Sequence, residues 1–262
     1  MSDQRNSAIT GGANGIGLAT AQQLAATGDQ VVLLDVADDK GEAEAEALRA
    51  AGLQAHYLHF DVREADHVAE VAAGIEAEIG PVDVLVNSAG LLQNAVTSWA
   101  SDLAEHDRIW QVNYRGTYVA CLAFGVAMRE RRRGAIINLA SINSFAVLPL
   151  PAYNLTKAAI KQLTELLAVE YGPYGVRINA VAPGYTLTEN LKARIDAGLR
   201  DGDQIKRSGA LEMFIHPEHI ADAIQFLASD KAAAITGVTL PVDAGWLAAV
   251  GAKGYPAEVE GA

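Results

Sequence analysis

Short apolar runs alternate along this chain with longer segments in which apolar residues recur every three or four positions. The runs have the length and composition of buried strands, whereas the periodic segments have the pattern of amphipathic helices. Strands are expected near residues 7–10, 31–35, 54–60, 82–86, 135–139, 176–181 and 238–242. Helices are expected near residues 18–25, 40–51, 64–79, 102–131, 153–169 and 217–228.

Strands and helices follow one another from end to end, without a repeat, a low-complexity tract or a linker. This alternation predicts one α/β domain over residues 1–262. We expect a Rossmann-type doubly wound three-layer sandwich with a mostly parallel seven-stranded sheet. Ligands of such sheets bind in the crevice at the carboxyl ends of the strands.

The first predicted strand leads into the glycine-rich turn Gly11-Gly12-Ala13-Asn14-Gly15-Ile16-Gly17, and the second predicted strand ends in Asp35. A strand, a glycine turn, a helix and a strand ending in an acid form the context of a dinucleotide-binding fingerprint. The glycine spacing differs from GxGxxG, so the context carries the argument. Glycines let the backbone approach a pyrophosphate, and a helix N-terminus offers free N–H groups. The turn therefore favours nucleotide binding over an ordinary glycine-rich loop.

Asp35 indicates which nucleotide is preferred. A carboxylate at this position accepts hydrogen bonds from both ribose hydroxyls and repels a 2′-phosphate. The residues that follow, Val36, Ala37, Asp38 and Asp39, include no arginine that would bind such a phosphate. The sequence therefore favours NAD over NADP, and the alternative is a solvated loop acid.

Composition excludes several other classes of function. Lysine and arginine total 20 against 32 acidic residues, which gives a formal net charge of −12 and argues against binding to nucleic acid. Because the chain has neither an 18-residue apolar run nor a signal-like N-terminus, we expect a cytoplasmic protein without membrane contact. The six histidines are scattered, and His216-Pro217-Glu218-His219 lacks the spacing of a zinc-binding HExxH helix, so no metal site is expected.

Tyr153 and Lys157 open the helix expected near residues 153–169. Residues four apart share one face of a helix. A positive charge beside a phenol lowers its pKa from about 10, towards the range of a general acid or base near neutral pH. The same spacing is common on solvated helices, so these residues alone do not distinguish proton transfer from an exposed helix.

In their order and spacing these motifs resemble those of the short-chain dehydrogenase/reductase family along nearly the whole chain. The matching elements are Thr10-Gly11-xxx-Gly15-Ile16-Gly17, Asp35, Asp61-Val62, Asn87-Ser88-Ala89-Gly90, Asn113, Ser141, Tyr153-xxx-Lys157, Pro183-Gly184 and Thr188. One departure is visible, because the family's usual Asn-Asn-Ala-Gly reads Asn-Ser-Ala-Gly here. With this resemblance, proton transfer becomes the favoured interpretation of Tyr153 and Lys157.

The resemblance implies roles for four catalytic residues. Tyr153 would be the general acid/base, removing the substrate hydroxyl proton as hydride leaves the same carbon. Lys157 would lower the pKa of Tyr153 and hydrogen-bond the nicotinamide ribose. Ser141 would donate a hydrogen bond to the substrate oxygen. Asn113 would hold a water that relays protons from Lys157, unless it is an asparagine buried for helix packing.

The resemblance also implies that NAD is bound by a series of residues running from the pyrophosphate and adenosine to the nicotinamide carboxamide. They are Gly11, Asn14, Gly15, Ile16, Gly17, Asp35, Asp61, Val62, Asn87, Ala89, Gly90, Tyr153, Lys157, Pro183, Gly184, Thr186 and Thr188. A homotetramer is implied as well. The tail 247–262 would then reach a neighbouring subunit's active site or be disordered.

The implied substrate pocket has several hydrogen-bonding side chains, which suit a polyhydroxylated small molecule. Its residues are Ser141, Asn143, Tyr153, Tyr185 and Asn94, with Gln93, Ser144 and Asn154 beside them. The substrate loop, residues 185–215, carries basic residues that would suit an anionic group, but its acids nearly balance them.

The expected activity is NAD-dependent oxidation of a secondary alcohol on a sugar, polyol or similar metabolite to the ketone or lactone. Two alternatives remain open at this stage. One is a reductase of ketones or 3-oxoacyl thioesters, and the other is an inactive nucleotide-binding scaffold on the same fold.

Overall fold

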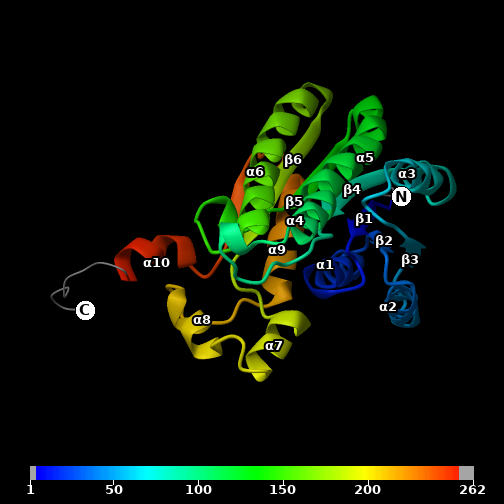
Figure 1. Cartoon of the computed structure of the whole chain (residues 1–262). Helices are drawn as coiled ribbons and strands as arrows, with labels where there is room; N and C mark the ends of the chain where they lie inside the picture. Colours follow the sequence, from blue (N-terminus) through cyan, green and yellow to red (C-terminus); the bar gives the residue numbers. More distant parts are fainter. Residues whose placement is uncertain (1–3, 254–262) are drawn as a thin grey trace.

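A computed structural model describes residues 4–253 and contains a seven-stranded sheet in the order β3-β2-β1-β4-β5-β6-β7 (Figure 1). The strands are β1 (Asn6–Thr10), β2 (Gln30–Asp35), β3 (Ala55–His59), β4 (Val82–Asn87), β5 (Gly134–Leu139), β6 (Val176–Pro183) and β7 (Thr239–Val242). Each neighbouring pair is parallel. The predicted seven-stranded, doubly wound sheet is confirmed, and its strand pairs are parallel throughout.

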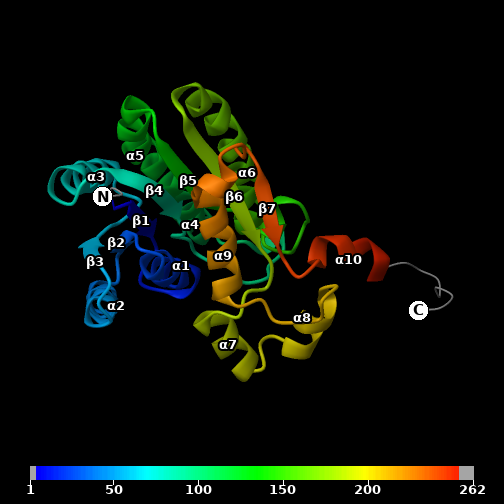
Figure 2. The ribbon, with the colours of Figure 1, turned by 180° about the vertical axis from the view of Figure 1, so that it is seen from behind.

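Helices cover both faces of the sheet, because alternate residues of each strand point to opposite sides. Val32 and Leu34 of β2 pack into one core, and Val31 and Leu33 pack into the other. The first core is closed by α3 (Ala65–Glu78), α5 (Thr117–Arg131) and α6 (Pro151–Tyr171). The second is closed by α1 (Gly15–Ala26), α2 (Asp38–Ala50) and α9 (Pro217–Ala228), which lie in front in Figure 2. The result is the expected three-layer sandwich.

The remaining helices are short. They are η1 (Ser98–Ala100), α4 (Leu103–Ile109), η2 (Trp110–Gly116), η3 (Ile142–Ser144), η4 (Gly172–Tyr174), α7 (Glu189–Asp196), α8 (Gly202–Ser208), η5 (Asp230–Ala232) and α10 (Trp246–Lys253). The long helix predicted for residues 102–131 is therefore α4, a π-helical turn η2 and α5 in succession. Hydrophobic periodicity tolerates one such inserted turn, so the sequence pattern did not reveal it.

The chain reverses its direction across the sheet between β3 and β4. It passes from β1 outward to β3 and then returns to β4 on the other side of β1. The loops that follow β1 and β4 consequently part from each other at the carboxyl edge, which is where an open α/β sheet binds its ligand.

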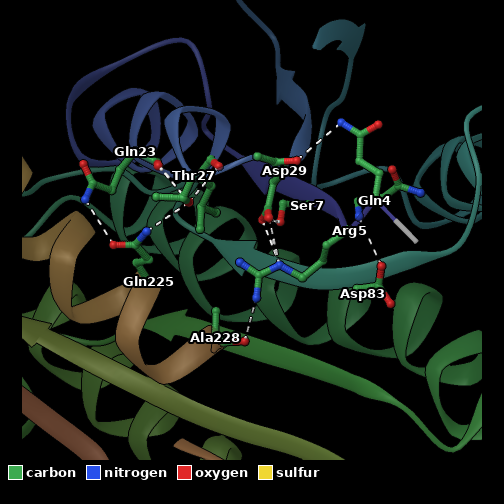
Figure 3. Close-up of polar contacts among 12 residues, drawn as sticks. Gln4, Arg5, Ser7, Gln23, Thr27, Asp29, Asp83, Gln225 and Ala228 are labelled. Atoms are coloured by element: carbon green, nitrogen blue, oxygen red, sulfur yellow. Dashed lines mark hydrogen bonds and ion pairs between the residues drawn. The ribbon is translucent and has the colours of Figure 1, made fainter. Parts of the chain in front are cut away.

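The opposite, amino-terminal edge is joined by polar contacts (Figure 3). The Arg5 guanidinium pairs with the Asp29 carboxylate at 2.9 Å and donates to the carbonyl of Ala228 at the end of α9. Gln225 of α9 likewise donates to the Thr27 hydroxyl at 3.0 Å. These bonds join β1, the turn before β2 and α9, far from the carboxyl edge.

Two segments that the sequence left without secondary structure contain helices. The segment 185–215 holds α7 and α8, each begun by a side chain that accepts a backbone N–H, Thr188 from Leu191 and Asp201 from Gln204. The tail begins with α10 (Trp246–Lys253). Residues 254–262 lie outside the described residues, so disorder of the tail and contact with a neighbouring subunit stay predictions. Within residues 4–253, no helix has the length and apolar character needed to cross a membrane.

Candidate active site

A cleft of about 1190 Å³ opens at the carboxyl edge of the sheet, where the loops that follow β1 and β4 diverge. Its walls come from the glycine turn, the ends of β2, β4, β5 and β6, the start of α6, and the segment that contains α7. Of the predicted site residues, those that line it are Gly11, Asn14, Gly15, Ile16, Asp35, Asp61, Val62, Ala89, Gly90, Ser141, Asn143, Tyr153, Lys157, Pro183, Gly184, Tyr185, Thr186 and Thr188.

The glycine turn leaves no room for side chains at two of its positions. A Cβ on Gly11 would lie 2.9 Å from the backbone of Ala89, and one on Gly17 would lie 2.1 Å from the carbonyl oxygen of Gly11. Gly11 also has φ +66°, which L-residues rarely adopt. Gly17 thus packs the first turn of α1 against the strand end, although it does not line the cleft itself.

The first turn of α1 faces the cleft with backbone N–H groups that no side chain caps. Asn14 is the N-cap residue, but its side chain makes no capping bond and its Oδ1 accepts from the Lys40 ammonium. No acidic residue lies in this turn. Free N–H groups and the positive end of the helix dipole fit the pyrophosphate of a dinucleotide. The residues present therefore fit the cofactor that the sequence predicted.

Asp35 lies at the end of β2 and lines the cleft. Its two carboxylate oxygens accept backbone N–H groups of Ala13 and Ala37, each at 3.1 Å, so the carboxylate is held in place beside the glycine turn. Asp61 also lines the cleft, and the Arg63 guanidinium that binds its carboxylate keeps the pKa of Asp61 below its usual value.

Asn87 lies at the end of β4 but does not line the cleft. Its Nδ2 donates to Asn138 Oδ1 at 2.9 Å and contacts Cys121 Sγ at 3.2 Å, while its Oδ1 is buried without a partner among the described residues. Ser88, the departure from the family pattern, does line the cleft, and its backbone N–H is held by the Thr10 hydroxyl. The Asn87 side chain therefore points into the protein interior, towards β5 and α5, and not into the cleft.

Tyr153 and Lys157 lie one turn apart on α6, as their spacing predicts, and both line the cleft. The Lys157 ammonium is 5.5 Å from the centre of the Tyr153 ring and donates to the carbonyl oxygen of Leu139 at 2.6 Å. Only 5% of Lys157 is exposed. Lysine side chains are rarely buried this deeply unless the ammonium has a polar partner, which here is the Leu139 carbonyl.

Asn113 belongs to the π-helical turn η2 and is fully buried. Its side chain makes two hydrogen bonds with the backbone of Leu91, accepting from N–H at 2.7 Å and donating to C=O at 2.9 Å. A Cβ added to Gly90 would lie 3.5 Å from Asn113 Oδ1 and 4.0 Å from Lys157 Nζ. The two polar groups thus flank one small space beside Gly90.

Ser141 follows β5 and is buried, with its hydroxyl between Tyr153 and Asn143. The hydroxyl donates to Asn143 Oδ1 at 3.0 Å and accepts the Asn143 backbone N–H at 3.2 Å. Asn143 is held in turn by Asn154, to whose side-chain oxygen it donates. Asn154 therefore points inward and supports Asn143.

Burial changes the acidity of the central pair in a direction that the sequence did not predict. Burial raises the pKa of Tyr153 to about 12, although the hydrogen bond with Ser141 lowers it, and burial lowers the pKa of Lys157 to about 8. The net shift of the Tyr153 pKa is therefore upward, and the expected lowering by Lys157 stays a prediction. Desolvation is the largest cause of both shifts, and the Lys157 ammonium donates its hydrogen bond to the Leu139 carbonyl.

Gln93 has a role that sequence reasoning missed. Its side-chain oxygen accepts the backbone N–H groups of Ala152 and Tyr153 at 3.0 and 3.1 Å, in the first turn of α6. Gln93 is 3% exposed and lines the cleft, and its Nε2 has no partner among the described residues. Gln93 consequently anchors the end of α6 that carries Tyr153.

The predicted substrate residues separate into an inner and an outer set. Tyr185 lines the cleft beside Ser141 and Asn143, with its ring 6.4 Å from that of Trp246. Asn94 is exposed and lies outside the main cleft, in an adjoining hollow with Arg194 and Arg200. The chain turns outward after Gln93, so Asn94 borders the adjoining hollow, and its role in substrate binding stays a prediction.

The residues after Pro183 close the cleft above the glycine turn. Thr186 pairs with Ile215, and Thr188 begins α7 with its methyl group 3.4 Å from the position of a Gly15 Cβ. Among residues 4–253, no three His, Cys, Asp or Glu side chains gather as a metal site would require.

Comparison with known proteins agrees with this geometry. A family profile described as enoyl-(acyl carrier protein) reductase matches residues 11–247. Galactitol 2-dehydrogenase of Rhizobium johnstonii is 36% identical, with 93% of this chain and 95% of the relative covered. Cis-4-hydroxycyclohexanecarboxylate dehydrogenase of Sinomonas cyclohexanicum is also 36% identical, with 94% and 97% covered.

A solved gluconate 5-dehydrogenase from Burkholderia cenocepacia, in complex with NADP and tartrate, superimposes with a TM-score of 0.89. It is 32% identical, and the match covers 95% of this chain and 97% of that one. These matches cover more than nine tenths of this chain at more than 30% identity. The chain therefore belongs to the short-chain dehydrogenase/reductase family of oxidoreductases, which act on CH–OH groups with a nicotinamide cofactor.

Proposed function

We propose that this protein is an NAD-dependent dehydrogenase that oxidises a secondary alcohol of a polar, hydroxylated substrate to the ketone or lactone. The observation that carries the proposal is the convergence of Tyr153, Lys157 and Ser141 on the cleft that the glycine turn also lines. Asn113 is buried next to Lys157, on the other side of the small space beside Gly90.

In this proposal NAD supplies the hydride acceptor, and the protein supplies position and proton transfer. Ser141 would donate a hydrogen bond from its hydroxyl to the substrate oxygen, in place of the hydrogen bond that it donates to Asn143. The Tyr153 phenolate then takes the proton of the substrate hydroxyl. Burial raises the pKa of Tyr153 to about 12, and the positive charges of Lys157 and of the oxidised nicotinamide that NAD would supply would lower it for this step.

Lys157 and Asn113 are proposed to carry the proton away from Tyr153. The Lys157 ammonium has a pKa lowered to about 8 by burial, so it exchanges protons near neutral pH more readily than an exposed lysine. The space beside Gly90, flanked by Lys157 and Asn113, supports an exit route along this side. The cofactor-binding assignments from Gly11 to Thr188 are retained as part of the proposal.

The preference for NAD rests on Asp35. Its carboxylate lines the cleft and is fixed by two backbone N–H groups, so it repels a 2′-phosphate at short range. The gluconate 5-dehydrogenase relative was solved with NADP, so the preference of this chain is argued from Asp35 and not from family membership.

The substrate class follows from the polar inner pocket. Ser141, Asn143, Tyr185 and Gln93 present hydroxyl and amide groups to one space, which suits several substrate hydroxyls. The relatives named for galactitol and gluconate act on polyhydroxylated compounds, in agreement with this choice.

We also propose a homotetrameric, cytoplasmic protein. The support is that α5 exposes Tyr118, Leu122 and Val126 and α6 exposes Leu166 and Val169, although both helices otherwise close the core. Apolar patches of this kind mark interfaces.

Nicotinamide absorbance with a panel of polyols, sugar acids and cyclic alcohols tests the proposed activity. Reduction of NAD by a hydroxylated substrate is the expected result. Reaction only in the reverse direction with NADPH and a ketone or 3-oxoacyl thioester would favour a reductase. Cofactor binding without any turnover would favour a nucleotide-binding scaffold.

A further inference from the structure

Two arginines project from the segment 185–215 towards the cleft. Arg194 belongs to α7, and Arg200 precedes Asp201, the N-cap residue of α8. Both line the main cleft and also the adjoining hollow of about 280 Å³ that contains Asn94. Both are half-buried rather than fully solvated.

Neither guanidinium forms a salt bridge with any residue that the structure describes. Arg194 has no side-chain hydrogen bond there, and Arg200 donates only to the adjacent carbonyl of Leu199. Each guanidinium carries five N–H donors, and the described residues engage few of them. These two therefore leave donors available to a ligand.

The acids of the same segment do not neutralise the pair. Glu189 lines the cleft but pairs with Lys40 at 3.3 Å, beside Asn14. Asp201 caps α8, and Asp203 pairs with Lys206 at 2.7 Å. Acids and bases are nearly balanced in number along this segment, but no acid of the described residues forms a salt bridge with Arg194 or Arg200.

The arginine pair lies on the substrate side of the cleft. Burial raises the pKa of Tyr185 and the Arg200 charge opposes that shift, so the guanidinium acts electrostatically on a phenol beside the catalytic residues. The hollow shared with Asn94 and Ala95 adjoins the loop that follows Gly90. The glycine turn that fits the pyrophosphate does not border this hollow.

We propose that Arg194 and Arg200, with the amide of Asn94, form a subsite for an anionic group on the substrate, a carboxylate or a phosphate. The proposal rests on the dehydrogenase function above and narrows its substrate to a hydroxy acid or a phosphorylated polyol. Guanidinium groups bind both anions through paired N–H donors. The alcohol would then be oriented from two ends, by Ser141 at the reacting carbon and by the arginines at the charge.

The test compares the wild-type protein with Arg194→Gln, Arg200→Gln and the conservative Arg194→Lys. Lys192→Gln is the matched control, because Lys192 is an exposed cation on α7 that lines neither space. Binding of tartrate, of glycerol 3-phosphate and of uncharged glycerol to the NADH complex is followed by cofactor fluorescence. Turnover is measured with gluconate, sorbitol 6-phosphate and sorbitol.

Each Gln variant is expected to weaken binding of one anion class by about tenfold or more, with glycerol binding and NADH affinity unchanged. Arg194→Lys should retain part of that binding, and Lys192→Gln should retain all of it. The anion that responds identifies carboxylate or phosphate. Equal anion binding in all variants would overturn the subsite, and weakened NADH binding would reassign the arginines to the cofactor. Anion binding without turnover would keep the subsite and contradict the dehydrogenase function.

Discussion

The cleft has two walls built on different physical principles. The nucleotide wall, residues 11–17 with 88–90, is backbone packed against backbone, and it is continued by α1 with six buried residues. The substrate wall, residues 185–215, carries α7 and α8, neither of which buries a residue. One wall thus has a fixed shape with few side chains, and the other presents side chains on a lightly packed frame.

The difference assigns separate tasks to the two walls. A nucleotide that is the same in every turnover is best held by rigid N–H groups, which need no side-chain ordering. A substrate must enter and leave, and segments with little buried apolar area open at low free-energy cost. Substitutions should therefore be costly for folding in the nucleotide wall and selective for chemistry elsewhere.

Gly17→Ala in the nucleotide wall is expected to have the largest effect on stability. The new Cβ would lie 2.1 Å from the carbonyl oxygen of Gly11, so the strand end and α1 must separate. We expect the free energy of unfolding to fall by about 3 kcal/mol or more, with loss of NADH binding. Denaturant unfolding and cofactor fluorescence measure both effects.

Gly198→Ala in the substrate wall is the matched control. Gly198 has φ +69°, but no atom lies within 4 Å of its Cβ position. The strain alone should cost about 1–2 kcal/mol and leave NADH binding intact. Equal losses in the two variants would remove the distinction between the walls.

Lys157→Met between the walls should lower turnover by about 10²-fold or more, because it removes a charged group that acts on Tyr153. Its stability at pH 7 should stay within about 2 kcal/mol of the wild type. The variant relieves burial of a charge but leaves the Leu139 carbonyl without a donor.

The pH dependence of stability distinguishes Lys157 from an ordinary lysine. Its pKa falls from 10.5 to about 8 on folding, so the unfolded chain binds more protons between these values. Its contribution to the free energy of unfolding therefore rises with pH from about 8 to 10.5. Unfolding curves of Lys157→Met should lack this rise, and an identical pH profile would show that burial does not perturb the lysine.

Asp35→Asn should change cofactor choice more than stability. Loss of the negative charge is expected to raise the ratio of kcat/KM with NADP to that with NAD by about tenfold or more. Asp38→Asn is the control, because Asp38 pairs with His59 and does not line the cleft. If both variants changed this kcat/KM ratio equally, the net charge of the region, and not the Asp35 carboxylate in particular, would determine cofactor choice.

Gln93→Leu should lower kcat by about tenfold, the smallest catalytic effect expected here. The substitution removes the oxygen that accepts the backbone N–H groups of Ala152 and Tyr153 in the first turn of α6. Gln93→Glu keeps an acceptor at that helix N-terminus and should restore most of kcat. Equal kcat values in the two variants would argue against positioning of Tyr153 by this side chain.

The nucleotide wall could be predicted from sequence, because glycine spacing and strand ends determine where its backbone lies. The same holds for the sheet and for Tyr153 and Lys157, whose helical spacing brings them to one face. The pKa values of Tyr153 and Lys157 could not be predicted from sequence, because desolvation depends on the elements that pack around them.

The substrate wall was harder to predict. The apolar residues of α7, Leu191, Ala193 and Ile195, are two positions apart and do not follow helical spacing, so the clearest local signal is the capping oxygen of Thr188. The directions of loop side chains could not be predicted from sequence either. Gln93 points inward and the adjacent Asn94 points outward. Loops have no fixed period that would assign such neighbours to opposite sides.

Tyr153→Phe tests the proposed chemistry most directly, since the substitution removes one oxygen whose only described partner is Ser141. With a substrate found in the panel, steady-state turnover with NAD is measured beside NADH affinity and thermal unfolding. We predict a fall in kcat of about 10²-fold or more, with NADH affinity and folding unchanged. Turnover near the wild-type rate in a folded variant that binds NADH would contradict Tyr153 as the base.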